Sequence, residues 1–484
     1  MTPFVTKVLA SAGYVTEAGE PLDGLVLSGP ARNAGDGPRV VPLLSNRPGG
    51  LGAEAVFRLG TSPVVVFKSL PAGTEDETRC HKLAWNFGVA PLLWITTPEY
   101  VRLYNAYQPP AEYEQQSPLL KEFPLGQALE HALADINATC SRRHIAMGSF
   151  WRSALASRID RQNRVDSVLL RELIALLGAL VRQDLRASLA QKLVGRCIFF
   201  QYLVHRGYVR EQELTQHFGA PSLDQILTDL DGTYNLFRWI RRTFNGDLFP
   251  IEDEATERAQ LRHDARLLRP LSDFFGHFTV SDRQGRLFPF RFDAIPVELI
   301  SSIYEKFVHT SEPDGEPPRG VHYTPINVVD LVLDPVFENL PPTARILDGA
   351  CGSGVFLVES LRRLVWLRSP TQPPTRELIR DVLMRQIRGV DISPAALSVA
   401  AFSLYLALLE IDPDPPRGLD ALDCLRFEPI QGRVLFSTST FNPSLAARIA
   451  DDQGRHGFDA IVGNPPWTYS AKRMTRRMTW AGVR

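Results

Sequence analysis

Apolar positions change their spacing twice along the chain, which divides the sequence into three regions. In residues 1–150, short apolar runs at 64–67, 92–95 and 100–104 lie between turns that contain Gly and Pro. Runs of this length, bounded by turn residues, are typical of β-strands. We therefore expect a small α/β domain over residues 1–150.

Helical spacing dominates residues 151–310. Apolar residues recur at positions 169, 170, 173, 174, 177 and 180, and a second apolar stripe covers residues 197–203. A third amphipathic segment follows Ile295 and Pro296. Because apolar residues three and four positions apart line one face of a helix, this region predicts a helical domain with a continuous core.

A polar linker with Pro and Gly at residues 311–318 opens the third region, which we place at residues 311–484. Strand and helix patterns alternate after it. This alternation is typical of a parallel sheet with helices on both faces. The expected fold class is therefore α/β, with the parallel sheet last in the chain.

Composition narrows the picture only slightly. Apolar residues make up 44% and charged residues 22% of the 484 positions, which fits a globular protein with more than one core. No apolar run is expected to approach the roughly 18 residues that a membrane helix needs, and residues 1–14 show no export signal. We expect a cytoplasmic protein. Five scattered cysteines without a Cys-x-x-Cys pair favour a reducing compartment over a zinc site. Basic residues at positions 472–484 form either a nucleic-acid patch or a solvated tail.

The first strand of the third region, residues 344–348, leads into a glycine-rich turn and then a helix that starts near Val355. The turn reads Asp348-Gly349-Ala350-Cys351-Gly352-Ser353-Gly354. Small residues let the backbone approach a ligand, and the amides at a helix start bind carboxylate or phosphate. Alone, this element predicts either a ligand-binding turn or a plain tight turn.

Two acids follow at places where a nucleotide-like ligand needs acceptors. The second strand, residues 387–391, ends at Asp391, and Ser393 and Pro394 are expected as cap and first turn of the next helix. An acid at this strand end accepts hydrogen bonds from ribose hydroxyls. Asp423 follows a Pro-rich loop, and we interpret it either as an acceptor for an adenine amino group or as an ordinary loop acid.

A further helix start precedes the sheet. Thr324 fits the cap position and Pro325 the first turn, and Pro335 is expected to end or kink this helix.

Residues 458–462 predict a short buried strand that ends in the loop Gly463-Asn464-Pro465-Pro466-Trp467. An amino group on an aromatic ring is a poor nucleophile because its lone pair is delocalised. The side-chain carbonyl of Asn464 and the backbone carbonyl of Pro465 can hold its two N–H groups and aim the lone pair at a methyl donor. Trp467 can stack on a base removed from the duplex. The alternative is a Pro-rich turn with a core tryptophan.

Taken in order, these motifs resemble the adenine-specific N6 DNA methyltransferases of type I and type IIG restriction-modification systems. The resemblance covers residues 320–467 and includes the segment Tyr323-Thr324-Pro325. It implies a Rossmann-like class I methyltransferase sheet preceded by a helical domain and a small α/β domain. It also implies methyl transfer from S-adenosyl-L-methionine to adenine N6 of a flipped base in double-stranded DNA, in restriction-modification or phage defence.

The resemblance also implies a role for each motif. Thr324 and the backbone around Ala350 and Gly352 would hold the methionine end of the cofactor, and Asp348 would stand near its sulfonium or amino group. The remaining cofactor-binding residues would be Tyr323, Cys351, Gly354, Asp391 at the ribose and Asp423 at the adenine. The catalytic loop would be Asn464, Pro465, Pro466 and Trp467. No metal is implied, because the sulfonium is itself a strong leaving group and the protein chiefly supplies alignment.

Two departures from that family lead to further expectations. The sequence ends at Arg484, where the family's sheet continues and a target-recognition domain follows, so we expect an incomplete sheet with an unpaired edge strand. The chain would then be a truncated enzyme that needs a complementing polypeptide, or a non-catalytic fragment. In residues 1–150, Lys68 follows a strand as in nuclease sites, but Val66 replaces the paired acid. We expect Lys68 to be a surface lysine or the remnant of a degenerate nuclease-like site.

A second enzyme class shares the Asn-Pro-Pro-aromatic loop. Protein glutamine N5-methyltransferases act on a side-chain amide, which presents a similarly conjugated nitrogen. Those enzymes lack the Tyr-Thr-Pro segment and the long helical region. Duplex DNA is therefore the expected substrate, with protein glutamine as the alternative.

Overall fold

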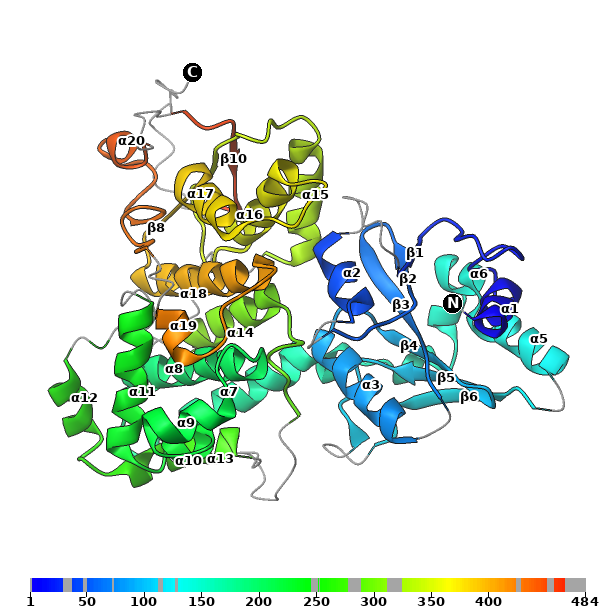
Figure 1. The fold of residues 1–484 in the computed structure, drawn as a ribbon, viewed down its shortest axis with the longest axis horizontal. Helices are drawn as coiled ribbons and strands as arrows, with labels where there is room; N and C mark the ends of the chain where they lie inside the picture. The colour runs from blue at the N-terminus through cyan, green and yellow to red at the C-terminus, as the bar shows by residue number, and fades with distance from the viewer. Residues whose placement is uncertain are drawn as a thin grey trace, which may run out of the picture. The chain divides into compact units, whose positions relative to one another are not determined.

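The computed structural model describes residues 2–28, 37–46, 50–71, 74–111, 116–126, 129–244, 251, 253–276, 289–310, 324–423, 428–450 and 457–465. Contacts divide the chain into two compact units, shown in Figure 1. Unit 1 comprises Met1–Arg171 and His277–Pro296, and unit 2 comprises Glu172–Gly276 and Val297–Arg484. The finer division at residues 1–150, 151–310 and 311–484 stays a prediction.

Unit 1 contains a mixed six-stranded sheet with the strand order β1-β2-β3-β4-β5-β6. Neighbouring strands are antiparallel except for β3 and β4, which are parallel with α3 between them in the chain. The three predicted strands are confirmed as β3, β4 and β5. The strands are β1 (Leu25–Leu27), β2 (Ala55–Leu59), β3 (Ser62–Ser69), β4 (Leu92–Thr96), β5 (Tyr100–Asn105) and β6 (Leu119–Pro124).

Both faces of this sheet pack on apolar clusters. Val65, Phe67 and Trp94 join a cluster that includes α1 and α5, whereas Val66 and Leu93 join one that includes α2 and α3. Because successive side chains of a strand point to opposite faces, each central strand serves both cores. The helices of unit 1 are α1 (Pro3–Ser11), α2 (Gly37–Leu44), α3 (Thr74–Phe87), α5 (Leu129–Cys140) and α6 (Arg142–Ala146).

The first part of unit 2 is helical, as the sequence predicts. The stripe at residues 197–203 lies in α8, where Phe199 packs edge-on against Phe244 at 4.7 Å between ring centroids. The segment after Pro296 is confirmed as α14. The helices here are α7 (Val165–Val181), α8 (Ala187–His205), α9 (Glu211–Phe218), α10 (Leu223–Ile226), α11 (Leu230–Thr243), α12 (Glu254–Gln260), α13 (Arg269–Phe275) and α14 (Val297–Thr310), with α7 running through the division between the units.

The second part of unit 2 contains a four-stranded sheet with the order β10-β7-β8-β9, and all neighbours are parallel. The strands are β7 (Ile346–Asp348), β8 (Ile387–Asp391), β9 (Leu435–Ser437) and β10 (Ala460–Val462). Its helices are α15 (Ile326–Phe337), α16 (Val355–Arg368), α17 (Arg376–Gln386), α18 (Pro394–Ile411), α19 (Leu419–Asp423) and α20 (Leu445–Arg448). The chain is therefore of mixed α/β class, with helices between parallel strands as expected.

Helix α18 is 18 residues long and apolar enough to cross a membrane by length and composition. The expectation that no apolar segment approaches this length was therefore wrong. In the structure α18 packs against α14, α16, β8 and β9, and most of its side chains are buried. Its hydrophobicity is explained by a position in the core, where a helix is covered on nearly all sides.

Two strand predictions need correction. The segment at 458–462 is not a fully buried strand: β10 covers only three residues, and Ile461 is 50% exposed. The reason is its place at one end of the order among the described strands, where only β7 covers it. Strand β9 was not predicted, although Val434, Leu435 and Phe436 form a short buried run after the turn at Gly432.

Candidate functional site

The carboxyl ends of the four parallel strands meet at one edge of the sheet of unit 2. Asp348 at the end of β7 is in register with Val462 at the end of β10. Asp391 at the end of β8 is in register with Ser437 at the end of β9. This edge therefore collects the glycine-rich turn, Asp391 and the Asn464 loop, which the sequence predicted to form one site. In open parallel sheets, ligands bind at this edge.

The glycine-rich turn adopts a conformation that side chains disfavour. Gly352 has φ 51° and Gly354 has φ 83°, both in the left-handed region. A Cβ on Gly354 would lie 3.1 Å from the Cβ of Ala400, so the turn also packs closely on α18. The amide of Cys351 donates to the carbonyl of Val390 at 3.0 Å, which fixes the turn beside β8.

Asp348 is a deeply buried acid at this edge, and its pKa is raised. It is 1% exposed, and its Oδ1 accepts a hydrogen bond from the amide of Ala350 at 3.1 Å. Among the described residues, its Oδ2 has no hydrogen-bond partner. Burial raises the pKa of Asp348 to about 7, with a smaller upward contribution from Asp391 and a downward one from the Ala350 amide. A buried acceptor without a partner is costly, so this oxygen is suited to a cationic ligand group.

Asp391 is tied to the same turn. Its Oδ2 accepts from the amide of Gly352 at 3.0 Å, and its Oδ1 accepts from the amide of Ser393 at 2.8 Å. Ser393 in turn caps α18, as predicted, by accepting from the amide of Ala396. The carboxylate is half-buried and each oxygen retains acceptor capacity. A role at a ribose stays a prediction.

The Asn464 loop lies against the same acid. Gly463 has φ 148°, and a Cβ there would lie 2.6 Å from Oδ1 of Asp348. The Nδ2 of Asn464 donates to Oγ1 of Thr324 at 3.2 Å, which joins the loop to the start of α15. Pro465 is exposed. Tyr323, Pro466 and Trp467 lie outside the described residues.

Helix α15 differs from its prediction in the position of its cap. Pro325 rather than Thr324 occupies the cap position, and the carbonyl of Pro325 accepts from the amide of Val328 at 2.8 Å. The helix continues two residues beyond Pro335 to Phe337, so this proline lies in its last turn, and a kink there stays a prediction.

In the structure, Asp423 contacts residues at the end of α11. It is the last residue of α19 and not a loop acid, and its Oδ2 accepts from Nη2 of Arg242 at 2.5 Å. The hydroxyl of Thr243 donates to its Oδ1. The described contacts therefore place this carboxylate at the end of α11. A role at an adenine stays a prediction.

Lys68 in unit 1 is not a surface lysine. It is half-buried on β3, and its Nζ donates to the carbonyl oxygen of Gly52. Glu54, which precedes β2, accepts instead from the amide of Ser69 at 2.7 Å and from its hydroxyl. The remaining interpretation, a degenerate nuclease-like site, stays a prediction.

Two residues at the edge were missed by sequence reasoning. Thr440 follows β9, and its hydroxyl donates to the carbonyl of Gly349 in the glycine-rich turn. No motif marks it, because its contact depends on β9 lying beside β8. Gly463 was quoted only as part of the loop. Its position directly before Asn464 was the signal that a close backbone approach is required there.

Comparison with known proteins gives a consistent picture. Residues 385–479 match the sequence profile of the family described as Eco57I restriction-modification methylase. The matched segment begins just before β8 and includes β9, β10 and the Asn464 loop. The predicted resemblance to restriction-modification methyltransferases of the type I and type IIG kind is thereby confirmed.

Individual relatives cover more of the chain. A stretch of 290 residues is 29% identical to the adenine-specific methyltransferase PglX of Streptomyces coelicolor, covering 50% of this chain and 23% of that protein. A stretch of 226 residues is 24% identical to the Type II restriction enzyme and methyltransferase RM.Eco57I of Escherichia coli, covering 37% of this chain and 22% of the relative. The chain thus spans less than a quarter of the length of these curated relatives.

Among solved structures, the cryo-EM structure of a DrdV–DNA complex aligns over 86% of this chain and 38% of that chain. The TM-score is 0.31 and the sequence identity is 14%.

Proposed function

We propose that this chain is an S-adenosyl-L-methionine-dependent methyltransferase that acts on adenine N6 of double-stranded DNA in a restriction-modification system. The observation that carries the proposal is the buried carboxyl group of Asp348, whose Oδ2 lacks a partner among the described residues and whose Oδ1 lies beside Gly463 of the Asn464 loop. The match of residues 385–479 to a restriction-modification methylase family supports the reaction. The similarity to PglX supports adenine as the target.

The fold supports the same proposal. The parallel strand order β10-β7-β8-β9 is the arrangement expected for the first part of a Rossmann-like class I methyltransferase sheet. It places the glycine-rich turn at the end of β7, next to the strand that leads into Asn464. The donor-binding turn and the substrate-binding loop are thereby neighbours at one edge.

The residues present fit the proposed cofactor. Oδ2 of Asp348 provides a buried acceptor for a cationic group of S-adenosyl-L-methionine, and the turn at residues 349–354 provides a close backbone surface. Asp391 would accept from the ribose, and Asp423 would share its carboxylate between Arg242 and the adenine. When bound, the cofactor supplies a methyl group on a sulfonium, which needs alignment more than activation.

Asn464 and Pro465 would act on the substrate. Their carbonyl oxygens would accept the two N–H groups of the adenine amino group and favour a tetrahedral nitrogen whose lone pair faces the donor. Proline keeps the loop rigid and offers no competing donor. The base would have to leave the duplex to reach this edge, which costs a few kcal/mol.

The test is transfer of a tritiated methyl group from S-adenosyl-L-methionine to duplex DNA, with Asn464→Ala as the matched variant. We expect label in adenine for the unaltered chain and a loss of about a hundredfold or more for Asn464→Ala. Cofactor affinity, measured by calorimetry, should be nearly unchanged in that variant. Label in protein glutamine instead of DNA would show that the substrate is a protein. Failure of the chain to bind the cofactor would overturn the proposal.

A complementing polypeptide and a cytoplasmic location both stay predictions. Repeating the transfer assay with the polypeptide encoded next to this chain tests the first of them.

A further inference from the structure

The hydrogen bond between Asn464 and Thr324 joins two segments that are 140 positions apart in the chain. Thr324 is 7% exposed, so its side chain is buried in unit 2. We propose that Thr324 is a positioning residue that orients the side-chain amide of Asn464, and that a network of ion pairs, most of them buried, holds Thr324 in place through α15. The assignment rests on the proposed function, in which Asn464 contacts the substrate.

The chemistry of an amide makes its orientation matter. One end of the planar group is a donor and the other is an acceptor, and a rotation by half a turn exchanges them. In the structure Nδ2 of Asn464 points to Oγ1 of Thr324, so the carbonyl end is directed elsewhere. A substrate amino group needs that carbonyl as an acceptor. By accepting from Nδ2, Thr324 thus stabilises the orientation that serves the proposed reaction, although a hydroxyl can also donate.

Thr324 itself depends on α15, which starts two positions later. This helix lies against α16 and β10, yet much of its apolar surface is exposed: Leu331 is 75% exposed, and Val328 and Val332 are partly exposed. Only Val329 and Leu333 bury apolar side chains completely. Apolar packing alone therefore fixes α15 weakly, and its polar contacts gain importance.

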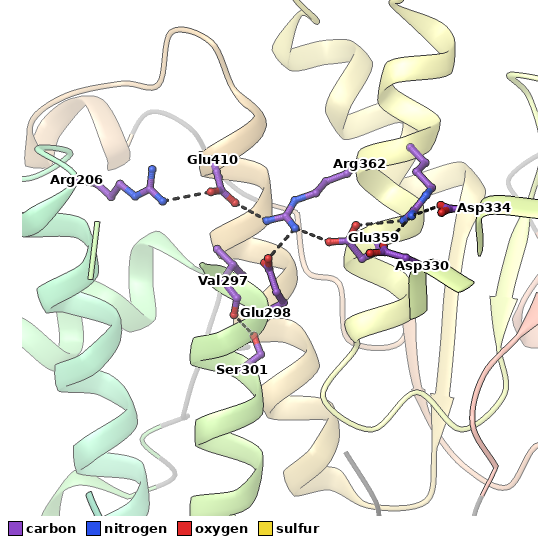
Figure 2. A network of polar contacts seen from close by, with 10 residues as sticks. Arg206, Val297, Glu298, Ser301, Asp330, Asp334, Glu359, Arg362 and Glu410 are labelled. Carbon is purple, nitrogen blue, oxygen red and sulfur yellow. Dashed lines mark hydrogen bonds and ion pairs between the residues drawn. The ribbon is translucent and has the colours of Figure 1, made fainter. Parts of the chain in front are cut away.

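Those polar contacts come from Arg363 on α16. Its Nη2 donates to Oδ1 of Asp330 at 2.9 Å and to Oδ1 of Asp334 at 2.8 Å, one helical turn apart on α15. Its Nη1 donates to Oε2 of Glu359 at 3.1 Å. Figure 2 shows Asp330, Asp334 and Glu359 converging on one guanidinium. Two carboxylates held by one arginine restrict both the rotation and the sliding of α15.

The network continues to the helices α14 and α18. Glu359 also accepts from Arg362 at 2.5 Å, and Arg362 donates further to Glu298 of α14 at 3.1 Å. Arg362 and Arg206 both donate to Glu410 of α18, at 2.5 and 3.2 Å (Figure 2). Helices α14, α15, α16 and α18 are therefore tied together. Since α16 begins at the glycine-rich turn, the same ties set the position of Thr324 relative to that turn.

The competing assignment is that Thr324 contacts the methionine end of the cofactor, as the resemblance implies. The two roles predict different losses. A cofactor contact affects cofactor affinity, whereas a positioning contact to Asn464 affects the rate at saturating cofactor.

The experiment compares Thr324→Val, which keeps the shape but removes the hydroxyl, with Thr324→Ser, which keeps the hydroxyl. The first readout is the side-chain NH₂ signal of Asn464 in the full chain labelled with ¹⁵N-asparagine, assigned by its absence in Asn464→Asp. We expect this signal to shift and its hydrogens to exchange faster in Thr324→Val, and to stay nearly unchanged in Thr324→Ser. An Asn464 signal that is unaffected by Thr324→Val would overturn the assignment.

The second readout is methyl transfer. Loss of one hydrogen bond should lower kcat about tenfold in Thr324→Val, with the cofactor Kd changed less than about twofold and most activity restored in Thr324→Ser. A large rise in Kd at unchanged kcat would show the cofactor role instead. The first readout needs no turnover. If the Asn464 signal changes in Thr324→Val but the unaltered chain transfers no methyl group, the contact between the two residues is supported and only the proposed function is rejected.

A third variant tests the support behind Thr324. Arg363→Lys keeps the charge but cannot bridge Asp330 and Asp334 in the same geometry. We expect the Asn464 signal to change in the same direction as in Thr324→Val. Arg385→Lys on α17, whose ion pair with Asp381 is half-exposed, is the matched control and should leave the signal unchanged. Equal effects of the two lysine variants would contradict the role of the network.

Discussion

The two sheets of the molecule differ in the length of their strands and in the charged groups that are buried beside them. The sheet of unit 1 has strands of up to eight residues, and both of its faces pack on apolar clusters. In the sheet of unit 2, β7, β9 and β10 have three residues each, and the cluster that includes Leu347, Val390 and Phe436 is small. Its helices pack through apolar side chains as well, and they are joined in addition by buried ion pairs, as in Figure 2.

This difference shows which part of the chain buries charged groups at a cost in folding free energy. Burying charges and an unpartnered carboxylate stabilises a protein less than apolar packing does, and often destabilises it. In unit 2, such groups are found at the carboxyl end of β7, where the proposed site lies, and on the helices α14, α16 and α18. In unit 1, the buried carboxylate of Glu77 on α3 accepts hydrogen bonds from Tyr100, Arg102 and Tyr104 of β5, so it has partners.

The largest effect is expected in the apolar core of unit 1. Trp94→Ala removes a fully buried ring that lies 5.4 Å from the ring of Phe67 and 6.1 Å from that of Tyr14, between centroids. We expect a loss of about 4 kcal/mol in the free energy of unfolding, because the cavity cannot close in a packed sheet. Hydrogen exchange of β3, β4 and β5 measures it. Trp94→Phe is the control, and an equal loss there would contradict the packing explanation.

A somewhat smaller effect is expected from the charges of unit 2. Arg362→Ala leaves the buried carboxylates of Glu298 and Glu359 without this partner, at a cost of about 3 kcal/mol. Burial raises the pKa of Glu298, so that carboxyl can take up a proton and relieve part of the cost. Exchange of α14, α16 and α18 should rise while that of unit 1 stays constant.

The half-exposed pair of Arg385 with Asp381 sharpens this prediction. Arg385→Ala should change the stability of unit 2 by about 0.5 kcal/mol or less, because solvent screens such pairs. Comparable losses in Arg362→Ala and Arg385→Ala would remove the distinction between buried and exposed pairs.

A smaller effect than that of Arg362→Ala is expected for the pH dependence contributed by Asp348. Its pKa is about 7 in the folded chain and near the ordinary 3.8 when unfolded, so the folded state binds the extra proton between these values. Stability is then fully present at low pH, falls as pH rises toward 7 and levels off above it. From pH 6 to pH 8 the loss is about 1 kcal/mol. Asp348→Asn should remove this part of the slope in urea unfolding, and an identical slope in both proteins would show that Asp348 is not protonated near pH 7.

Sequence reasoning predicted local features well and long-range contacts less well. It located the turn between β7 and α16 and the cap of α18 by Ser393, because glycine conformations and caps depend on a few neighbouring residues. It missed the strands β1, β2, β6 and β9, because short strands are defined by the strands that pair with them, and it predicted a buried strand at 458–462 although Ile461 is half-exposed. It also interpreted Asp423 without its partner Arg242, which is 181 positions earlier in the chain.

The sequence by itself determined the α/β class, the order of the motifs and the residue types at the edge of the second sheet. These follow from periods of two and 3.6 residues and from the conformational limits of Gly and Pro, all of which operate within short windows. Only the tertiary structure decided that Asn464 meets Thr324, that Oδ2 of Asp348 is buried without a partner among the described residues, and that Arg363 fixes α15. Burial and charge pairing depend on which distant segments fold together, and no short window contains that information.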